Sequence, residues 1–352
     1  MPDTTAHGLA SAATTDLRRI GAHPDHWYPL AWSRDIKRGK TAAVRFAGQA
    51  IVLVRTESGV LFALEDRCAH RQVPLHAGVV CGEEIKCCYH GWTYDGTGRC
   101  LSVPYIGAER MPNGVRAFPV KEVEGLVFVF PGTVALAETR PLPNLGRLSD
   151  SKYKTRRFGR TVACHYSFMH ENLIDMNHQF LHRRLMGSIR PRCLGYHSDG
   201  GTYEVRYTFA RTQGRQSFGE AAIFGAQAGG SLDDEDVMTI RTVYPHQTLE
   251  IRRAADDEPL MSLFIAYVPQ DAEQRTIRTF GTISVLKPKI PGIIHLAWPF
   301  LVWFTEGTFR EDRWIVEREQ EAWDRQGYDA NQEIFPATRD LRRFLAAHGQ
   351  PA

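Results

Sequence analysis

The sequence predicts a two-domain α+β protein in which an all-β unit precedes a sheet covered by helices. The chain has 352 residues, which is too long for one ordinary hydrophobic core. Short apolar segments separated by turn residues fill residues 27–132, and a long helical segment appears only from about residue 165. We therefore expect an N-terminal arm over residues 1–26, a β domain over 27–133 and a second domain over 134–352.

Composition and charge exclude several classes of protein. Hydrophobic residues make up 43% and charged residues 24%, with a net charge of +3, so nothing indicates a nucleic-acid partner. The first residues lack a basic stretch followed by an apolar one, so we expect a cytoplasmic protein without a secretory signal. In a reducing compartment, clustered cysteines are more often metal ligands than disulfides.

The β domain is expected from its hairpin patterns. Ala42–Phe46 and Ile51–Val54 flank the turn Ala47-Gly48, and a further strand covers Val60–Leu64. The last strand of this domain is expected at Leu126–Phe130. The segment Ala135–Asn144, rich in proline and small residues, is interpreted as a linker.

The second domain mixes helices and strands. A helix without Pro or Gly is expected from about His165 to Arg184, and two more are expected over Arg310–Arg325 and Ala337–His348. Strands are expected at Tyr203–Phe209 and Leu263–Val268, which together with the helices indicate an α+β domain. The acidic run from Asp233 to Asp236 is interpreted as a solvated loop.

The apolar stretch from Ile290 to Phe309 is interrupted by Pro291, Gly292 and Pro299, so it is a poor membrane-spanning helix. This stretch could form part of a pocket wall, belong to the core or contact a membrane surface, and the sequence leaves all three interpretations open.

Two loops of the β domain carry one cysteine and one histidine each. The chain reads Cys68-Ala69-His70 in the first loop and Cys87-Cys88-Tyr89-His90 in the second. A sulfide-bridged pair of irons needs two thiolates on one iron and two imidazoles on the other. Structural zinc sites more often group Cys with Cys and His with His. The spacing therefore favours a [2Fe–2S] cluster held by Cys68, His70, Cys87 and His90.

The remaining cysteines have no such spacing. Cys88 competes with Cys87 as a ligand, but the distance to His90 favours Cys87, and Cys88 is interpreted as a small buried side chain. Cys81, Cys100, Cys164 and Cys193 are expected to be inert core or surface residues.

A second set of possible metal ligands follows about ninety residues later. If residues 165–184 form one helix, then Glu171, Asp175, His178 and His182 share one face, because each residue turns the helix by about 100°. His178 and His182, four residues apart, can then reach one metal ion. His165 and His170 fall off this face. Two histidines and one carboxylate form the usual site of non-haem Fe(II), with positions left open for O₂ and substrate.

The carboxylate must come from elsewhere in the chain. Asp312 is the preferred candidate, because it shares a face of the predicted helix 310–325 with Ile315, Val316, Glu319 and Trp323. This places Asp312 at the start of a helix with one buried side. Glu311 is the alternative.

Both motifs, in this order, resemble the α-subunits of Rieske non-haem iron ring-hydroxylating oxygenases, from about Trp27 to Trp323. The C-x-H…C-x-x-H pattern fits fully, although Cys88 stands where proline is common. The D-x-x-H-x-x-x-H pattern, with three residues between the histidines, is similar to the carbazole dioxygenase-like branch, whose α-subunits form homotrimers. The resemblance implies a helix-grip (START-like) catalytic domain with an antiparallel sheet. It also implies electrons from NAD(P)H through a ferredoxin or reductase.

The resemblance also implies roles for individual residues. His178, His182 and Asp312 match the iron ligands. Asp175 matches a carboxylate that links a cluster histidine of one subunit to an iron histidine of its neighbour. This carboxylate can also orient His178 from one turn away.

The expected activity is hydroxylation, cis-dihydroxylation or oxidative dealkylation of an apolar, aromatic or heteroaromatic compound with O₂. The pocket wall is expected from Leu185, Met186, the strands near Phe264 and residues 290–304, although the same side chains suit a core equally well. Alternatives are a non-aromatic substrate such as an N-methyl amine or steroid, a pure electron carrier, and a ligand-binding protein that lacks iron.

Overall fold

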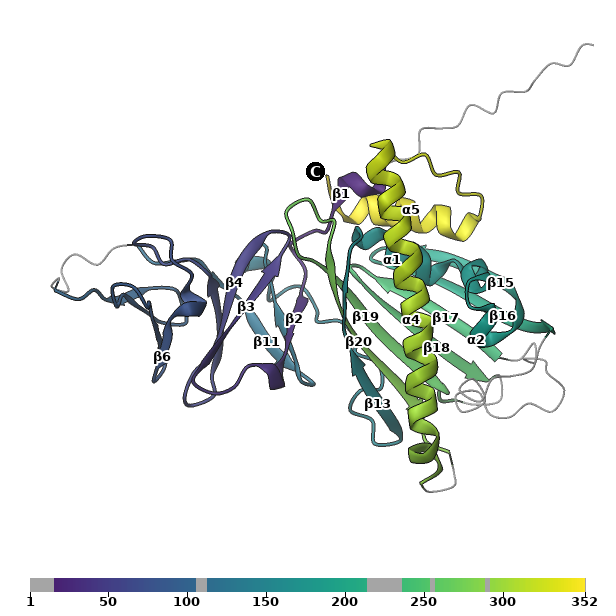
Figure 1. Cartoon of the computed structure of the whole chain (residues 1–352), viewed down its shortest axis with the longest axis horizontal. Helices are drawn as coiled ribbons and strands as arrows, with labels where there is room; N and C mark the ends of the chain where they lie inside the picture. Colours follow the sequence, from purple (N-terminus) through teal and green to yellow (C-terminus); the bar gives the residue numbers. More distant parts are fainter. Residues whose placement is uncertain (1–15, 106–112, 214–235, 254–256, 289–291, 352) are drawn as a thin grey trace, which may run out of the picture.

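The computed structural model describes residues 16–105, 113–213, 236–253, 257–288 and 292–351. Figure 1 shows a β domain beside a large sheet that is crossed by one long helix. Residues 1–15 of the expected arm lie outside the described residues. Residues 16–25 pack on the second domain, where β1 (Ile20–Gly21) pairs with β21 (Gln350–Pro351). This part of the arm is therefore an edge extension.

The first domain consists of strands joined by short turns. They form three antiparallel sheets with the orders β10-β5-β4-β3, β11-β12-β2 and β6-β7-β8-β9. The strands are β2 (Tyr28–Trp32), β3 (Lys40–Phe46), β4 (Gln49–Arg55), β5 (Leu61–Glu65), β6 (Val79–Cys81), β7 (Glu84–Lys86), β8 (Thr93–Tyr94), β9 (Cys100–Ser102), β10 (Ala117–Phe118), β11 (Val120–Val123) and β12 (Leu126–Val129). The expected β3–β4 hairpin is confirmed.

The tip of this hairpin contacts the second domain. Ala47 and Gly48 have positive φ angles of 45° and 81°, as a two-residue hairpin turn requires. Their amides donate hydrogen bonds of 2.9 and 3.0 Å to the carbonyls of Pro269 and Gln270. A Cβ atom on Gly48 would lie only 2.9 Å from that of Ala272, so glycine satisfies both the turn and the contact.

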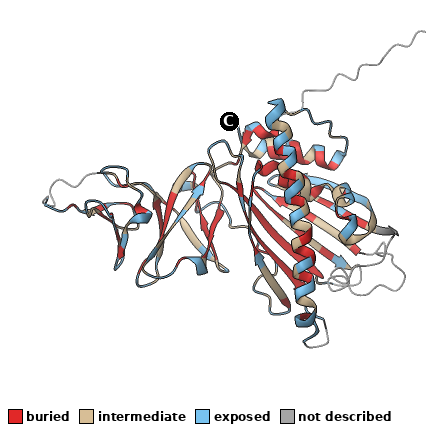
Figure 2. Cartoon of the chain, in the orientation of Figure 1, coloured by how far each residue is buried: buried red, intermediate tan, exposed pale blue. Residues whose placement is uncertain are grey.

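Hydrophobic packing joins the two domains. One core cluster extends through both of them and includes Tyr28, Trp32 and Phe280, while a smaller cluster lies under the loops that carry Cys68 and Cys87. Figure 2 shows the buried residues concentrated on the large sheet and on the strands that face it. The β domain is thus fixed against the second domain through apolar contacts.

The second domain is built on an 8-stranded sheet in which every strand pair is antiparallel, in the order β13-β20-β19-β18-β17-β16-β15 with β14 beside β20. Its strands are β13 (Tyr153–Phe158), β14 (Thr161–Val162), β15 (Ser188–Asp199), β16 (Thr202–Gln213), β17 (Asp236–Val243), β18 (His246–Arg253), β19 (Met261–Pro269) and β20 (Ile277–Leu286). The α+β fold with an antiparallel sheet, expected from the sequence, is confirmed.

Helices cover one face of this sheet (Figure 1). They are α1 (Tyr166–Ile174), α2 (Arg183–Met186), α4 (Ile293–Gln326) and α5 (Pro336–His348). α5 matches the expected helix, but α4 starts at Ile293 instead of Arg310. Pro299 lies within its second turn, where a proline removes one hydrogen bond near the helix end and does not stop the helix. As a result Asp312 lies in the middle of a long helix, and the prediction that it starts one is wrong.

Candidate metal centres

The segment that carries the two histidines is not the single helix expected from the sequence. α1 ends at Ile174, Asp175 adopts an extended conformation with ψ of 92°, and Met176–Phe180 form a 3-10 turn before α2. The Asp175 carboxylate accepts a hydrogen bond of 2.9 Å from the amide of Asn177. Such a side-chain bond competes with helix continuation, which explains the break. The prediction that the two histidines share one face of a single helix is therefore wrong.

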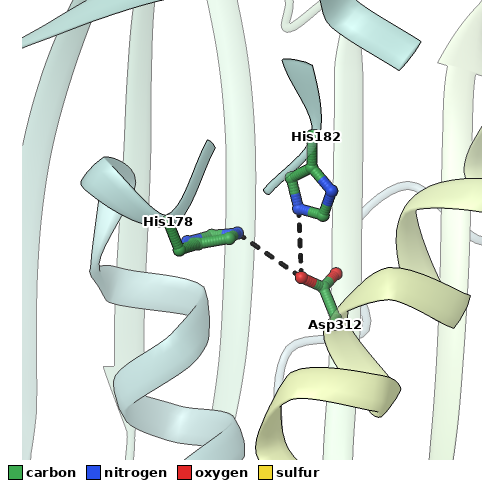
Figure 3. Close-up of side chains that lie close together, drawn as sticks. All are labelled: His178, His182 and Asp312. Carbon is green, nitrogen blue, oxygen red and sulfur yellow. Dashed lines mark ion pairs between the residues drawn. The ribbon is translucent and has the colours of Figure 1, made fainter. Parts of the chain in front are cut away.

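The two histidines nevertheless converge on Asp312 of α4 (Figure 3). Oδ1 of Asp312 lies 3.1 Å from Nε2 of His182 and 3.5 Å from Nε2 of His178. His182 and Asp312 are buried, and His178 is partly buried. The three residues selected from the sequence thus lie together, although the backbone brings them together by a different path.

The other ring nitrogen of each histidine is occupied. Nδ1 of His182 lies 2.8 Å from Oε2 of Glu311, and Nδ1 of His178 contacts the backbone carbonyl of Asp175. Each Nε2 is therefore directed at the common centre, as outer partners of metal-binding histidines commonly arrange. Burial opposes protonation of His182, but the Asp312 and Glu311 carboxylates outweigh it and raise its pKa. Glu311, the alternative ligand, contacts the far side of His182.

These three side chains fit a metal ion. Ligand atoms about 2.1 Å from one metal, at right angles to each other, lie about 3 Å apart. The measured separations of 3.1 and 3.5 Å are close to this value. Nε2 of His182 and Oδ1 of Asp312 are also buried without a hydrogen-bond partner among the described residues. A metal ion would satisfy both atoms, and the donor set is the one typical of Fe(II).

A cavity of about 190 Å³ opens onto this centre. Its wall is mostly aliphatic, with three phenylalanines. The apolar lining residues are Leu173, Met176, Met186, Ile189, Phe209, Met238, Leu249, Ile251, Met261, Leu263, Ile283, Phe304 and Phe309. Met186, Phe304 and the strand of Phe264 were expected here, whereas Leu185 contacts Gly307 of α4 instead.

The apolar side chains of residues 292–309 do not share one environment. Phe304 and Phe309 line the cavity, and Ile294 and Leu301 are buried in the core. Ala297, Trp298 and Val302 are half-buried, and the exposed apolar side chains are Ile293, Leu296, Phe300 and Trp303. No helix among the described residues is long and apolar enough to cross a membrane.

The acidic run is not wholly a solvated loop. Asp236, its last residue, is buried at the start of β17 and lines the cavity. The other three residues of the run lie outside the described residues. Nothing in the local sequence distinguishes Asp236 from the other three acidic residues. Its side chain faces the cavity because of how β17 pairs with its neighbouring strands.

The cysteine–histidine loops have the same backbone design. In each, the cysteine amide donates to the carbonyl five residues later, Val73 or Trp92, with a distance of 2.8 Å. The amide four residues later, of Gln72 or Gly91, donates back to the cysteine carbonyl, and these two residues have positive φ angles of 60° and 72°. Two equivalent turns thus present two equivalent thiols.

The side chains of these loops divide by depth. Cys68 and Cys87 are buried, while His70 and His90 are exposed with ring centroids 4.5 Å apart. Burial, together with the neighbouring Cys68, raises the pKa of Cys87. Two adjacent thiols inside and two adjacent imidazoles outside match the ligand set of a cluster with one iron on each pair.

Neighbouring aromatic residues complete this site. Trp92 stacks on His70 with a centroid distance of 4.8 Å, as a packing residue would. The Tyr94 hydroxyl lies 3.2 Å from Sγ of Cys68, a contact that the sequence did not reveal because the tyrosine comes from the next strand, β8. Cys88 is exposed, so its interpretation as a buried side chain is wrong.

Asp175 lies on the opposite side of His178 from the apolar cavity. It lines a second, more polar cavity together with Asn172, His178, Glu319 and Glu333. Its carboxylate accepts hydrogen bonds from Asn177, so the backbone carbonyl of Asp175, rather than its carboxylate, orients His178 within this chain.

Glu171, expected on the metal-binding face, belongs to a buried ion network. Its two oxygens lie 2.6 Å from Arg18 and 2.6 Å from Arg342, and Arg342 also pairs with Asp329. The network ties the N-terminal segment and α5 to α1.

Comparisons with protein families agree with this division into two sites. Residues 26–122 match the family described as Rieske [2Fe-2S] domain, and residues 162–341 match the vanillate O-demethylase oxygenase C-terminal domain. The second match covers half of the chain.

Individual relatives support the same grouping. A 4beta-methylsterol monooxygenase of Methylococcus capsulatus is 32% identical over 93% of this chain and 89% of its own length. The oxygenase component of dicamba O-demethylase from Stenotrophomonas maltophilia is 35% identical over 45% of this chain and 47% of its own length. A crystal structure of dicamba monooxygenase bound to dicamba has a TM-score of 0.72 at 21% identity, covering 92% of this chain and 96% of that one.

Proposed function

We infer the role of this chain from one premise: it belongs to the Rieske oxygenases, and is the terminal oxygenase component of such a system. Members carry a Rieske [2Fe–2S] cluster and a mononuclear iron, and receive electrons from partner proteins. We propose that Cys68, Cys87, His70 and His90 hold the cluster. His178, His182 and Asp312 would hold the iron.

One observation carries the proposed activity: the three candidate iron ligands lie in the wall of an apolar cavity. When bound, the iron supplies the O₂ chemistry and the cluster supplies single electrons. The chain's own residues position the ligands and the substrate and shield the centre from water. Glu311 and the Asp175 carbonyl orient the two imidazoles, while the Met, Ile, Leu and Phe side chains exclude water and place an apolar substrate beside the centre.

The proposed reaction is hydroxylation or oxidative dealkylation of an apolar ring compound. Relatives named for demethylation of dicamba and vanillate support dealkylation. A second candidate is oxidation of a methylated alicyclic compound of the sterol type. Two observations favour it: the cavity wall is more aliphatic than aromatic, and the relative that matches nearly the whole chain is named for a 4β-methylsterol.

We further propose that electrons reach the chain from NAD(P)H through a ferredoxin or a reductase. A homotrimer is proposed from the resemblance to the homotrimeric branch. The sheet β6-β7-β8-β9, which lies between the exposed His70 and His90 in the chain or next to them, is at the end of the molecule far from α1 and α4, so a neighbouring chain is the better electron acceptor (Figure 1). Asp175 would then bridge His90 of one chain and His178 of the next. A cytoplasmic location is proposed because all seven cysteines are free.

Metal analysis and turnover test these proposals together. Purified protein should contain about three iron atoms and about two acid-labile sulfides per chain. With a reductase and NADH, O₂ uptake should be stimulated by aromatic methyl ethers or methylated alicyclic compounds, and ¹⁸O from O₂ should appear in the product or in the released aldehyde. Turnover confined to small zwitterions would contradict the apolar cavity as the substrate site.

A further inference from the structure

The N-terminal part of α4 has an exposed apolar face. Ile293, Leu296, Phe300 and Trp303 have 43%, 78%, 53% and 62% of their surface exposed. Their spacing places them in one stripe along the helix. Figure 2 shows the exposure along this end of α4, which extends beyond α1 and α2. Four large apolar side chains in a row on the surface usually mark a binding site.

The stripe is free of formal charge. Between Gly292 and Phe309 the only acidic or basic residue besides His295 is Glu306, and its carboxylate pairs with Arg156 and Arg160. A helix face of this length that contacts only water would carry charged residues. The stripe therefore needs an apolar counterpart.

Lysine side chains form a basic border along the β13 side of the same end of α4. Nζ of Lys154 lies 2.7 Å from Nδ1 of His295 and 4.5 Å from the ring of Trp298, both on α4. Lys152, just before β13, and Lys287, just after β20, are joined by a backbone hydrogen bond of 2.9 Å. Lys152 pairs with Glu258, whereas neither Lys154 nor Lys287 forms an ion pair with a described carboxylate. The border is thus net positive.

We propose that this stripe, defined by Ile293, Leu296, Phe300 and Trp303, binds the surface of an anionic lipid bilayer. An apolar helix face with aromatic residues and a basic border suits the boundary between acyl chains and acidic headgroups. A second copy of this chain fits less well, because a symmetric contact between two stripes would bring the lysine borders together.

The position of the stripe leaves the metal centres free. Leu296 precedes Asp312 by roughly 24 Å along the helix axis, at 1.5 Å per residue. The polar cavity at Asp175, where a neighbouring subunit is proposed to dock, is on the Asp312 side. Membrane contact and subunit contact are therefore compatible.

The same helix also lines the substrate cavity. Phe304 and Phe309 follow the stripe directly and face the cavity, so one helix connects the proposed bilayer contact to the wall beside Asp312. If the proposed apolar substrate is correct, the stripe would let it enter from the lipid phase. This consequence rests on the proposed function, but lipid binding itself does not.

Co-sedimentation of the full metal-loaded protein with vesicles tests the proposal. Vesicles of phosphatidylcholine with about 30% phosphatidylglycerol should bind the protein in about 0.15 M salt, and pure phosphatidylcholine vesicles should bind it more weakly. The double variant Leu296→Glu, Trp303→Glu should reduce binding at least about tenfold. Lys287→Gln should weaken binding to the anionic vesicles only.

Trp314→Glu is the matched control, since Trp314 is 52% exposed on the same helix but outside the stripe. It should bind vesicles like the wild type. No binding to anionic vesicles, or unchanged binding of the double variant, would overturn the proposal. So would a double variant that changes the oligomeric state while vesicle binding is unaffected, which would identify the stripe as a subunit contact. Turnover of a water-soluble substrate by the double variant, measured without vesicles, tests the proposed function separately.

Discussion

The two candidate metal centres differ in what they expose. In the β domain the thiols are buried and the imidazoles of His70 and His90 face solvent. In the second domain His182 and Asp312 are buried, and the centre faces an apolar cavity. The first arrangement suits transfer of electrons to another molecule, whereas the second suits chemistry from which water is excluded.

The two centres also differ in how they are held. Each cysteine loop is shaped by backbone hydrogen bonds within six residues. The other centre joins His178 and His182 to a residue of α4 about 130 positions later, and the helix that precedes them is fixed by the Arg18–Glu171–Arg342 network. One site is local and the other depends on the whole domain.

Removal of Asp312 should have the largest effect of the changes proposed here, and it should affect only the buried centre. Asp312→Ala should lose the mononuclear iron and all turnover, because two imidazoles hold Fe(II) weakly. Iron should fall from about three to about two atoms per chain while the cluster spectrum persists. The matched variant Glu311→Gln should keep the iron with about tenfold weaker affinity. If Glu311→Gln loses the iron and Asp312→Ala is active, the assigned ligand is wrong.

The corresponding test of the exposed centre uses two adjacent cysteines. Cys87→Ser should bleach the protein and abolish the EPR signal of the reduced cluster, since a thiolate ligand is lost. Cys88→Ser should keep both, because Cys88 is exposed, whereas Cys68 and Cys87 are buried together. The opposite result would exchange the two assignments.

Asp175→Asn tests the link between the two centres. Turnover should fall about a hundredfold, while both metals remain bound and an external donor still reduces the cluster. Asn177→Ala is the matched control, since it removes the side-chain donor to the carboxylate but keeps the carboxylate and the backbone amide bonded to it. Near-normal turnover in Asp175→Asn would contradict the proposed bridge between subunits.

The ion network should contribute stability rather than chemistry. Arg342→Met leaves Asp329 without its buried partner and leaves Glu171 with Arg18 alone, so the free energy of unfolding should fall by about 3 kcal/mol. Arg343→Met, on the exposed side of α5, should change it by less than about 0.5 kcal/mol. Chemical denaturation at neutral pH measures both, and equal effects would contradict the network's role.

The smallest expected effect depends on pH. Burial alone would raise the pKa of Asp329, but hydrogen bonding to Arg342 outweighs it and lowers the pKa below 3.8. A carboxyl with a lowered pKa stabilises the fold above its unfolded pKa and loses this contribution as pH falls through the folded value. Asp329→Asn should therefore cost about 1–2 kcal/mol at pH 7, and the difference from wild type should shrink below about pH 4. A constant difference across this range, in thermal unfolding, would contradict the assignment.

Local sequence was sufficient for the cluster loops and for most strands. The hairpin at Ala47-Gly48 and the helix α5 were predicted because turn residues and apolar periodicity act within a few positions. The break after α1 was not predicted, because a helical-wheel projection treats residues 165–184 as one continuous helix. In the structure the Asp175 carboxylate accepts a competing hydrogen bond from the Asn177 amide. The start of α4 was missed because Pro291, Gly292 and Pro299 were taken to interrupt the stretch before Arg310.

The sequence by itself determined which residues are the candidate ligands and their order along the chain, since residue type and short spacing select the chemistry of a metal site. The tertiary structure alone decided which atoms meet. The separations of 3.1 and 3.5 Å at Asp312, the inward turn of Asp236 and the exposed stripe on α4 all depend on contacts between segments far apart in the chain. Such contacts leave no periodic pattern in the sequence, because the packing of whole elements sets them.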